Sequence, residues 1–559
     1  MNACARALLF RHCRHRILAA LLVGGTILGF QSAGAQVVLT WTSGDILNVT
    51  TGVGASISTP VINEGVTLNI TTAGSHTFDG RQLVNHGTIA WSGGNFVAGN
   101  SATLTNNGTL NDTSPGNFGN SGAGGATMTF TNAAGATYNK QSAGTKDTNV
   151  AVTNAGTINV DAGTLRFNSG GSSTGPLAAA AGATVQFTNH FSVPDLAKLT
   201  GPGLYELTGG TLSAGGALTV AAFNQTGGTL AGTFTLASGH TFTWSGGNWN
   251  ASGTTTIANG ATLNLSSSSG KDFNARSVTN SGTVNWQGGH LGSGTGGALV
   301  NATGATFNDL NADGVSIHTP FGGTFSFAND GTYRKTGTGT TTVGIPFTNT
   351  GTLAVNAGTL ILGSTFTNSG ALALAGGATL QSSGTISLGT STLSGTGTVS
   401  APSVTAGGLV SPGNSSGNLS LTGNLTLLAT STLLVELGGT VPGTGHDFLG
   451  VGGTAALAGT LSLRFLAGFE AFVSPTSTFT VLTASGAGGL TGSFSNIANG
   501  AQLLTSDGRG LFQVNYGPSS AFAANSLVLS HFVPVPEPST YVLLGLGALT
   551  LAVFSRRRT

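Results

Sequence analysis

The chain has 559 residues, of which 92 are glycine, 39% are hydrophobic and only 6% are charged, which excludes a largely disordered protein and is typical of turn-rich β structure. The only two cysteines, Cys4 and Cys13, lie in an N-terminal segment that we expect to be removed, so disulfides and cysteine-based metal sites are excluded in the mature protein. Seven of the 18 lysines and arginines lie in the terminal segments, which leaves 11 basic against 17 acidic residues and excludes a basic face for nucleic acid.

Residues 1–35 have the organisation of a secretory signal peptide. A basic segment, residues 6–16, precedes an apolar segment, residues 17–30, that we expect to be helical. The small residues Ala33-Gly34-Ala35 then form a cleavage site that predicts Gln36 as the first mature residue. An uncleaved membrane anchor is the alternative, but the apolar segment is short compared with the about 20 residues that span a bilayer. We therefore expect signal peptidase to act here and the protein to leave the cytoplasm.

Residues 36–405 carry a short repeat of the form Asn-x-Gly-Thr followed by an apolar residue. Copies begin at Asn85, Asn106, Asn154, Asn280, Asn329, Asn349 and, in degenerate form, Asn368. The closest copies lie 19 to 21 residues apart, which is the size of one solenoid coil. Asn and Gly predict a turn with a positive φ. The Thr-apolar alternation that follows predicts a strand whose alternate residues, such as Leu353 and Val355, face the core.

A longer period lies above the short one, because a shift of 195 residues superposes residues from about 59–168 on about 254–363. The shift matches Trp91 to Trp286, Tyr138 to Tyr333 and Lys140 to Lys335. A unit that duplicates by whole coils is typical of a one-dimensional stack. The sequence therefore predicts an all-β fold, a parallel β-solenoid of the right-handed β-helix type over residues 36–405. Antiparallel β-sandwich domains are the alternative.

Residues 406–529 alternate Gly-rich turns with more apolar strands, such as residues 433–437 and 479–482. In this order the segment resembles the last coils of an autotransporter passenger or a related surface-protein β-helix. The resemblance implies that residues 406–529 form a C-terminal β cap of the solenoid. A cap makes physical sense because an uncovered terminal strand invites end-to-end aggregation.

Residues 530–559 contain three elements in order. The tripeptide Pro536-Glu537-Pro538 comes first, an uncharged apolar segment follows over residues 541–554, and Arg556-Arg557-Arg558 form a basic end. The apolar segment predicts a transmembrane helix whose arginines stay at the cytoplasmic face.

In these residues the tail resembles the PEP-CTERM sorting signal of Gram-negative bacteria. The resemblance implies export across the inner membrane, transient anchoring there by the C-terminal helix, and processing by an exosortase-like enzyme near the tripeptide. It also implies delivery to the cell surface or to the exopolysaccharide matrix. An ordinary C-terminal anchor is the alternative, and it too would leave the bulk of the chain outside.

The segment Asp309-Leu310-Asn311-Ala312-Asp313-Gly314 matches the first half of a calcium-binding loop. Oxygens of Asp309, Asn311 and Asp313 would converge on the ion, and the glycine would allow the sharp turn. The last ligand position of such a loop is Pro320 rather than an acidic residue. We therefore favour an Asx-rich loop without a ligand, with a weak calcium site as the alternative.

Paired charges are sparse, and they occur at corresponding places of the two copies. Asp79 lies near Arg81 in the first copy, and Asp272 lies near Lys271 and Arg276 in the second. Acidic and basic residues on adjacent coils are what a polysaccharide-cleaving β-helix would need, so these positions are candidates for catalysis or sugar binding. We favour solvated loop ion pairs.

Three tryptophans, Trp91, Trp244 and Trp286, precede a Gly-Gly turn. At an exposed corner such rings could stack on sugars, but we predict that they pack on the core beside the turn. His446-Asp447 suggests a base and its orienting acid. Adjacent residues of a strand point to opposite faces, however, so we predict a structural role.

Together these observations predict an exported structural or adhesin-like protein of the cell surface or extracellular matrix, associated with exopolysaccharide and without catalytic activity. The alternatives are a β-helix polysaccharide lyase or hydrolase and a calcium-stabilised adhesin. We expect no cofactor other than the candidate calcium, and no nucleic-acid partner.

Overall fold

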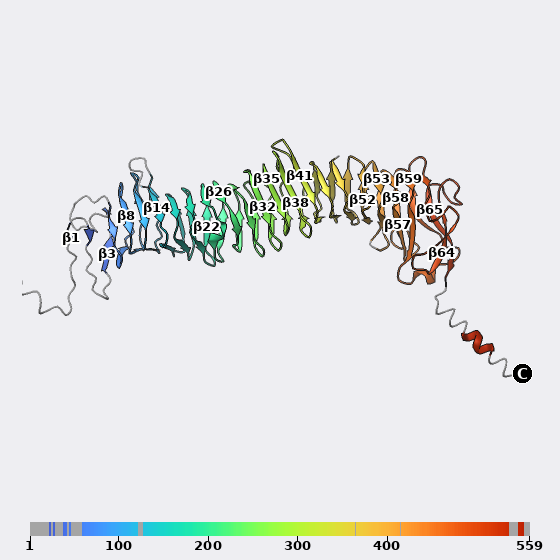
Figure 1. Cartoon of the computed structure of the whole chain (residues 1–559), viewed down its shortest axis with the longest axis horizontal. Helices are drawn as coiled ribbons and strands as arrows, with labels where there is room; N and C mark the ends of the chain where they lie inside the picture. Colours follow the sequence, from blue (N-terminus) through green and yellow to red (C-terminus); the bar gives the residue numbers. More distant parts are fainter. Residues whose placement is uncertain are drawn as a thin grey trace, which may run out of the picture. The chain divides into compact units, whose positions relative to one another are not determined.

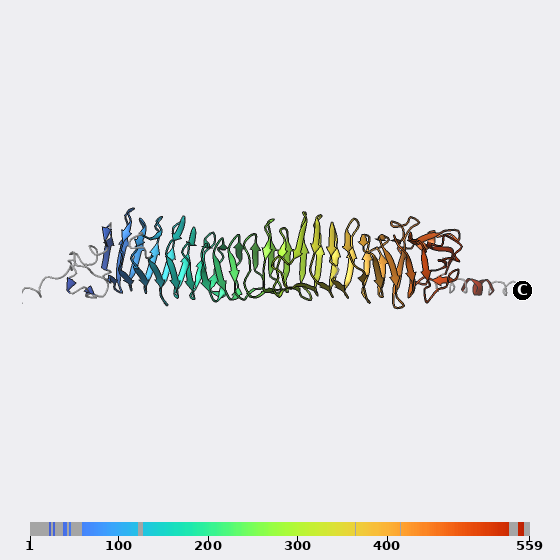
Figure 2. The same ribbon diagram turned by 90° about the horizontal axis from the view of Figure 1, so that it is seen from above.

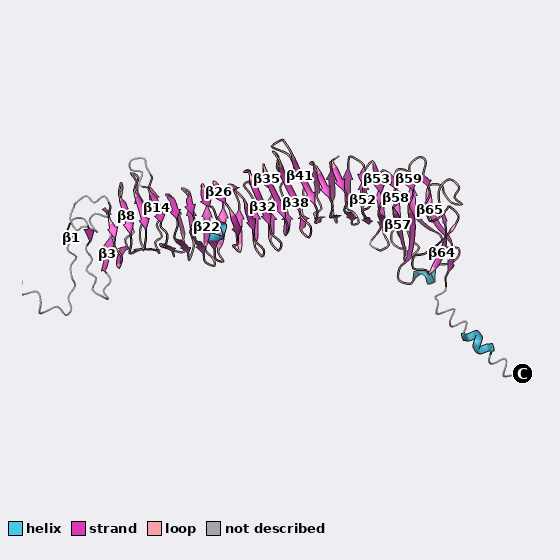
Figure 3. Cartoon of the chain, in the orientation of Figure 1, coloured by secondary structure: helices cyan, strands magenta, loops and turns pink. Residues whose placement is uncertain are grey.

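A computed structural model of the chain describes residues 22–23, 26–27, 37–41, 44–45, 59–120, 127–363, 365–413, 415–535 and 546–552. The chain divides into two compact units, residues 1–223 (unit 1) and 224–559 (unit 2). Each unit is an all-β solenoid of parallel strands, and the two contain about 17 turns (Figure 1, Figure 3). The predicted parallel β-solenoid is therefore confirmed, and the β-sandwich alternative is wrong.

Of the segment predicted to be a signal helix, the structure describes only residues 22–23 and 26–27. Strands β1 (Leu22–Val23) and β2 (Thr26–Ile27) pair antiparallel inside the segment predicted to be helical. The predicted cleavage site, Ala33, Ala35 and Gln36, lies outside the described residues.

Unit 1 has three faces of parallel strands, and successive strands of each turn belong to different faces. Strands of successive turns lie side by side (Figure 2). The first face contains β3 (Val37–Trp41), β6 (Val66–Ile70), β9 (Thr88–Trp91), β12 (Thr109–Asp112), β15 (Thr137–Lys140), β18 (Thr157–Val160), β21 (Leu177–Ala179) and β24 (Leu199–Thr200). The second contains β4 (Gly44–Asp45), β7 (His76–Thr77), β10 (Phe96–Ala98), β13 (Phe118–Asn120), β16 (Thr145–Thr148), β19 (Thr164–Phe167), β22 (Thr184–Phe187) and β25 (Leu204–Leu207). The third contains β5 (Val61–Ile62), β8 (Gln82–Asn85), β11 (Thr103–Asn106), β14 (Thr129–Asn132), β17 (Ala151–Asn154), β20 (Gly171–Ser173), β23 (Phe191–Val193) and β26 (Thr211–Ala214). The short helix η2 (Leu196–Lys198) precedes β24, and β27 (Gly216–Leu218) and β28 (Ala222–Gln225) follow β26.

Alternation along each strand places the core inside the coil. In β12, Leu110 is buried while Thr109 and Asn111 are half-buried on the outside. Aromatic rings from successive turns pack inside, and the Phe118 and Phe130 rings stack with centroids 5.2 Å apart. Burial of this apolar surface, at about 25 cal/mol per Å², stabilises the described part of the chain, which contains no cysteine.

The motif asparagines of unit 1, together with Asn132, form a buried amide ladder, which we call the inner ladder. Asn85, Asn106, Asn132 and Asn154 end successive strands of the third face and are at most 1% exposed. Each Nδ2 donates to the Oδ1 of the next asparagine, at 2.6, 2.8 and 2.8 Å, and Asn154 donates to the Ser173 hydroxyl at 2.8 Å. Each Nδ2 also donates to a backbone carbonyl, because an amide carries two N–H donors.

The motif glycine is required by close packing rather than by a positive φ, so the predicted positive-φ turn is wrong. Gly156 does not have a positive φ. A Cβ atom at this position would lie 2.4 Å from the carbonyl oxygens of both Ala133 and Ala136. The turns therefore stack with no room for a side chain.

Unit 2 has the same organisation with more turns. The ladder face contains β30 (Phe234–Leu236), β32 (Gly253–Ile257), β35 (Arg276–Asn280), β38 (Gly297–Asn301), β41 (Phe325–Asn329), β44 (Phe347–Asn349) and β47 (Phe366–Asn368), and a second sheet contains β50 (Ile386–Ser387), β53 (Ser403–Ala406), β56 (Asn424–Leu427), β59 (Ala455–Leu457) and β62 (Leu490–Gly492). The next face contains β31 (Thr241–Trp244), β33 (Thr262–Leu265), β36 (Thr283–Trp286), β39 (Thr306–Asp309), β42 (Thr332–Lys335), β45 (Thr352–Val355), β48 (Ala371–Leu374), β51 (Leu393–Gly395), β54 (Leu409–Pro412), β57 (Thr432–Leu437) and β60 (Thr460–Phe465). The last contains β34 (Lys271–Asp272), β37 (Leu291–Gly292), β40 (Val315–His318), β43 (Thr340–Val343), β46 (Thr359–Leu362), β49 (Thr379–Ser382), β52 (Thr398–Ser400), β55 (Asn418–Leu421), β58 (Phe448–Val451) and β61 (Phe479–Ala484). The strand β29 (Thr229–Ala231) precedes these, and the short helix η3 (Phe469–Phe472) lies between β60 and β61.

Parallel pairing continues past residue 405, where the sequence places the start of the cap. For example, β57 pairs with β60 over six residues in parallel. The antiparallel strands β65 (Ser526–Pro534), β64 (Gly510–Asn515) and β63 (Gln502–Leu504) then add to β61 and end that sheet.

The inner ladder has a counterpart in unit 2. Asn280, Asn301, Asn329, Asn349 and Asn368 are joined by amide hydrogen bonds of 2.6 to 2.7 Å. Asn368 then donates to the Ser391 hydroxyl at 3.1 Å. Both units therefore satisfy the motif asparagine in the same way.

Strand register makes the two copies directly comparable. One inward column of unit 1 reads Trp41, Ile70, Trp91, Asp112, Lys140 and Val160. The corresponding column of unit 2 reads Trp244, Leu265, Trp286, Asp309, Lys335 and Val355. The aromatic, acidic and basic residues follow one another in the same order in both columns.

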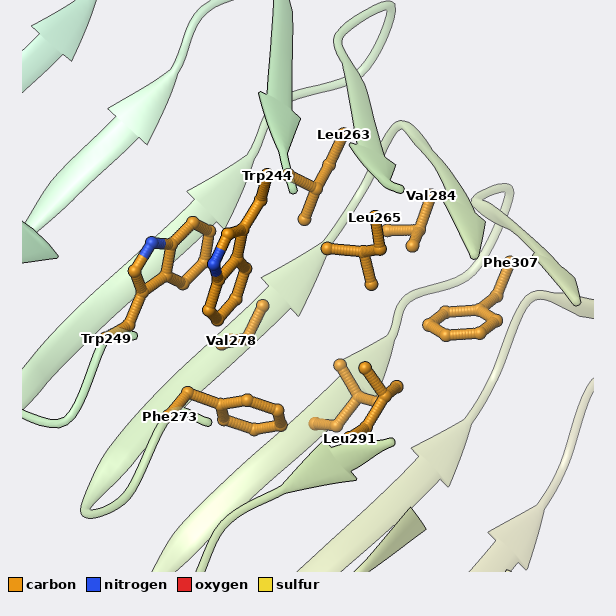
Figure 4. Close-up of a pocket in the computed structure, with 10 residues that line it drawn as sticks. Trp244, Trp249, Leu263, Leu265, Phe273, Val278, Val284, Leu291 and Phe307 are labelled. Carbon is orange, nitrogen blue, oxygen red and sulfur yellow. The ribbon is translucent and has the colours of Figure 1, made fainter. Parts of the chain in front are cut away.

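A small apolar cavity of about 20 Å³ lies in the core of unit 2 (Figure 4). Trp244, Trp249 and Phe273 lie toward one side of it, and Leu291 and Phe307 toward the other. The two indole rings stack with centroids 4.2 Å apart. Apolar cavities of this kind stay dry, so it is a packing gap rather than a site for a polar ligand.

Candidate functional site

A carboxylate and two ammonium groups are buried inside unit 1. The side chains of Asp112, Lys140 and Lys146 are 0% exposed. Lys146 Nζ lies 3.0 Å from Asp112 Oδ1, and the Tyr138 hydroxyl donates to Asp112 Oδ2 at 2.9 Å. Lys146 Nζ also lies 3.7 Å from the centroid of the Trp91 ring. We call these five residues the Asp112 site.

Burial shifts the pKa values of the ionisable groups in the Asp112 site. It raises the pKa of Asp112 to about 6, even though Lys146 and Tyr138 oppose the shift. Burial also lowers the pKa of Lys146, and it lowers the pKa of Lys140 to about 8. Lys140 donates to three backbone carbonyl oxygens rather than to Asp112. The proton affinities of the Asp112 carboxylate and the Lys146 amine therefore approach one another.

Unit 2 contains the corresponding arrangement, which we call the Asp309 site. The hydroxyls of Tyr333 and Thr341 donate to Asp309 Oδ2 at 2.9 and 2.6 Å. Lys335 Nζ lies 3.7 Å from the same oxygen. Thr341 follows Lys146 by the duplication offset of 195 residues, so a hydroxyl replaces one of the two ammonium groups.

The structure does not bring the three predicted calcium ligands together. Asp309 and Asn311 are buried, and Asn311 Nδ2 donates to Asp309 Oδ1 at 2.8 Å, whereas Asp313 is exposed. Among the described residues, no group of three or more His, Cys, Asp or Glu side chains could hold a metal ion.

The charges near Asp272 are corrected by the structure. Lys271 and Arg276 are 0% exposed, so the predicted solvated ion pair is wrong for both. Arg276 donates to the carbonyl oxygen of Gly232 at 2.8 Å and to the Thr255 hydroxyl at 2.9 Å. Lys271 donates to a backbone carbonyl. Backbone acceptors therefore take the place of a carboxylate and allow both cations to be buried.

His446 and Asp447 are held by the backbone, in agreement with the predicted structural role. Both His446 ring nitrogens lie 3.1 Å from backbone carbonyl oxygens. Asp447 accepts two backbone N–H groups, each at 2.9 Å. Burial raises the pKa of Asp447 to about 7 and lowers the pKa of His446.

The tryptophans before the Gly-Gly turns pack in the core, as predicted. Trp91, Trp244 and Trp286 are at most 2% exposed. Each indole N–H donates to a carbonyl of its own turn, at 2.9 Å for Trp91 and 2.8 Å for Trp286. Stacking of these rings on sugars is therefore excluded.

Rows of threonine and asparagine lie on the outside of one face in each unit, and we call them the Thr-Asn rows. They comprise Thr109, Asn111, Thr137, Asn139, Thr157 and Asn159 in unit 1, and Thr262, Asn264, Thr283, Asn285, Thr306 and Asn308 in unit 2. The side chains are half-buried. The asparagines bond to one another along the row, at 2.8 Å in unit 1 and 2.9 Å in unit 2. Each amide therefore keeps a donor and an acceptor for a partner outside.

A polar cavity of about 350 Å³ lies among the last strands and loops of unit 2. Its lining includes Ser493, Ser495, Ser519, Asn499 and Tyr516. Asn499 Nδ2 donates to the carbonyl oxygen of Ser519 at 3.0 Å. The volume falls within the range of about 300 to 1,000 Å³ that small-molecule sites occupy.

The Asp112 site was not predicted from the sequence. Tyr138 and Lys140 served only as markers of the duplication. The sequence did contain a signal for it, namely a lysine at an inward position of a strand in a chain with only 6% charged residues. A buried ammonium group needs hydrogen-bond acceptors, so such a lysine predicts an inward acceptor on a neighbouring strand.

Of the sorting signal, Pro534 ends β65 and residues 546–552 are helical. Pro536, Glu537, Pro538, Arg556, Arg557 and Arg558 lie outside the described residues. In the part of the chain that the structure describes, we find no helix with the length and apolarity that a membrane crossing requires.

Comparison with known proteins finds a match in the C-terminal tail of the chain. No curated protein matches the chain. Residues 534–558 match the PEP-CTERM protein-sorting motif, which confirms the resemblance noted in the sequence. The motif implies that the chain is an exported, surface-sorted protein that an exosortase-like enzyme processes.

Proposed function

We propose that the chain is a non-enzymatic structural or adhesin-like protein of the cell surface or extracellular matrix, which associates with exopolysaccharide through its Thr-Asn rows. The export route that we propose is transient anchoring in the inner membrane of a Gram-negative bacterium by the C-terminal helix. The observation that carries the proposal is the repetition of uncharged hydroxyl and amide groups on one outer face.

The chemistry of these rows fits a neutral polymer of sugars. Strands of adjacent turns are about 4.8 Å apart, so a row offers hydrogen-bonding groups at a regular spacing along the stack. The inward tryptophans cannot stack on a ligand, so recognition depends on hydrogen bonds. Binding should therefore change little with salt, unlike binding through charged groups.

The test is binding of the purified full chain to neutral and anionic polysaccharides at low and high salt. We expect salt-independent binding to neutral polymers, and we expect the double variant Asn111→Lys, Asn139→Lys to weaken it at least tenfold. The matched control is Thr131→Lys, Thr153→Lys, which adds the same charge on the third face. Equal loss in both variants, or sustained depolymerisation of any polymer, would contradict the proposal.

A further inference from the structure

The Asp112 site has no part in the proposed binding face, yet it buries three ionisable side chains, two of which, Asp112 and Lys146, form an ion pair. We propose that Lys146 and Asp112 condense into an intramolecular isopeptide bond inside unit 1.

The geometry brings the reacting groups together. Lys146 Nζ lies 3.0 Å from Asp112 Oδ1, and both side chains are 0% exposed. The backbone N–H of Ser114 donates to Oδ1 at 3.0 Å, and the Tyr138 hydroxyl donates to Oδ2 at 2.9 Å. These two donors fix the carboxyl group while the amine lies against it, as an intramolecular reaction requires.

The surroundings lower the cost of forming the neutral reactants. The Trp91 and Phe118 rings pack against each other with centroids 5.0 Å apart, and both are at most 1% exposed. Burial beside these rings raises the pKa of Asp112 and lowers the pKa of Lys146, although Lys146 Nζ also donates to the carbonyl oxygens of Ser114, at 3.0 Å, and Gly116. One proton then passes from the ammonium to the carboxylate, which leaves an amine and a carboxylic acid.

The bond-forming step balances without a further reactant. The Lys146 nitrogen lone pair attacks the Asp112 carboxyl carbon, and the C–N bond forms. The bond from that carbon to the hydroxyl oxygen breaks, and the hydroxyl leaves as water with a second proton from the nitrogen. The Tyr138 O–H stabilises the negative charge that develops on the remaining oxygen. An ammonium and a carboxylate thus become one amide and one water, with no change in oxidation state.

The Asp309 site supplies a control within the same chain. Thr341 stands in the place of Lys146, and its hydroxyl donates to the carboxylate at 2.6 Å. Lys335 lies farther away, 3.7 Å from an oxygen that already accepts two hydroxyl donors. We therefore expect no bond at this site.

The test is a tryptic digest of the purified full chain, read by mass spectrometry. Cleavage after Arg81, Lys140 and Arg166 should release residues 82–140 joined to residues 141–166, at the sum of their masses less one water. Cleavage after Lys146 should be absent, because its amine is acylated, while cleavage after Lys335 should proceed normally.

The variant Lys146→Thr gives unit 1 the residue that unit 2 has, and its digest should contain residues 82–140 and 141–166 as separate peptides. The peptide masses from the unsubstituted chain test the proposal even if this variant does not fold. Free residues 141–146, together with unlinked residues 82–140 at full mass from the folded chain, would show an ion pair only and would overturn the proposal.

Discussion

Replacing one residue of the inner ladder should open unit 1 locally. Asn132→Ala removes the acceptor of the Asn106 amide at 2.8 Å, and it removes the donor to Asn154 Oδ1 at 2.8 Å and to the Thr157 carbonyl at 3.0 Å. Two or more buried polar groups lose their partners, and each such loss costs about 1 to 3 kcal/mol. We expect the free energy of unfolding to fall by roughly 2 to 6 kcal/mol.

Asn139→Ala is the matched control, because Asn139 also accepts one amide hydrogen bond and donates another, each at 2.8 Å. It is half-buried on the outside, where water replaces the lost partners. We therefore expect a cost below about 1 kcal/mol.

The assay must report local opening, since a solenoid gains its stability turn by turn. Hydrogen exchange read by mass spectrometry across residues 103–160 measures it, together with a urea titration. Asn132→Ala should speed exchange in β11, β14 and β17 far more than Asn139→Ala does. Equal loss of protection in the two variants would refute the reasoning that burial makes the ladder essential.

Three further outcomes are expected. Gly156→Ala should destabilise unit 1 by about 3 kcal/mol or more because of its overlap with carbonyl oxygens, whereas Gly144→Ala, whose Cβ would meet nothing within 4 Å, should be neutral in the same urea titration. Folded Asp447 keeps its proton up to a pKa of about 7, against an ordinary value of 3.8, so the folded state binds more protons between these values. The free energy of unfolding should then fall as the pH rises from about 4 to 7, and Asp447→Asn should flatten that slope in urea titrations at several pH values. Because Asp309 is engaged by Tyr333, Thr341 and Lys335, a calcium chelator should leave the melting temperature unchanged, and a drop of several degrees would restore the calcium hypothesis.

The period of the sequence was enough to predict the solenoid, because strand alternation and coil length are local properties. Leu353 and Val355 face the core as predicted, and both are at most 1% exposed. The tryptophans before the Gly-Gly turns were also predicted to be buried. In each case a large apolar side chain next to a turn is most favourably placed in the core of the coil.

What the sequence did not predict depends on contacts between turns. The motif asparagine fits a turn when a single coil is considered, and only stacking shows that it bonds to the asparagine above and below. Arg276 was expected in solvent because charged side chains are seldom buried, but the carbonyl oxygens of Gly232 and Trp249, which lie between strands of neighbouring turns, accept its hydrogen bonds. The Asp112 site is of the same kind, since its members come from three successive strands of the first face, β9, β12 and β15, and from β16 of the second.

The inner ladder constrains how such a chain can change its length. Each asparagine after the first accepts from the preceding turn and donates to the following one, so the ladder has a direction. At its first member in unit 1, Asn85 Oδ1 has no hydrogen-bond partner within the described residues. Inserting or deleting complete turns leaves each internal amide matched, whereas a partial turn would leave a buried amide unmatched and cost about 1 to 3 kcal/mol. Recombination between the copies would therefore yield foldable products only in steps of whole turns, and the number of turns becomes a heritable quantity that varies in discrete units.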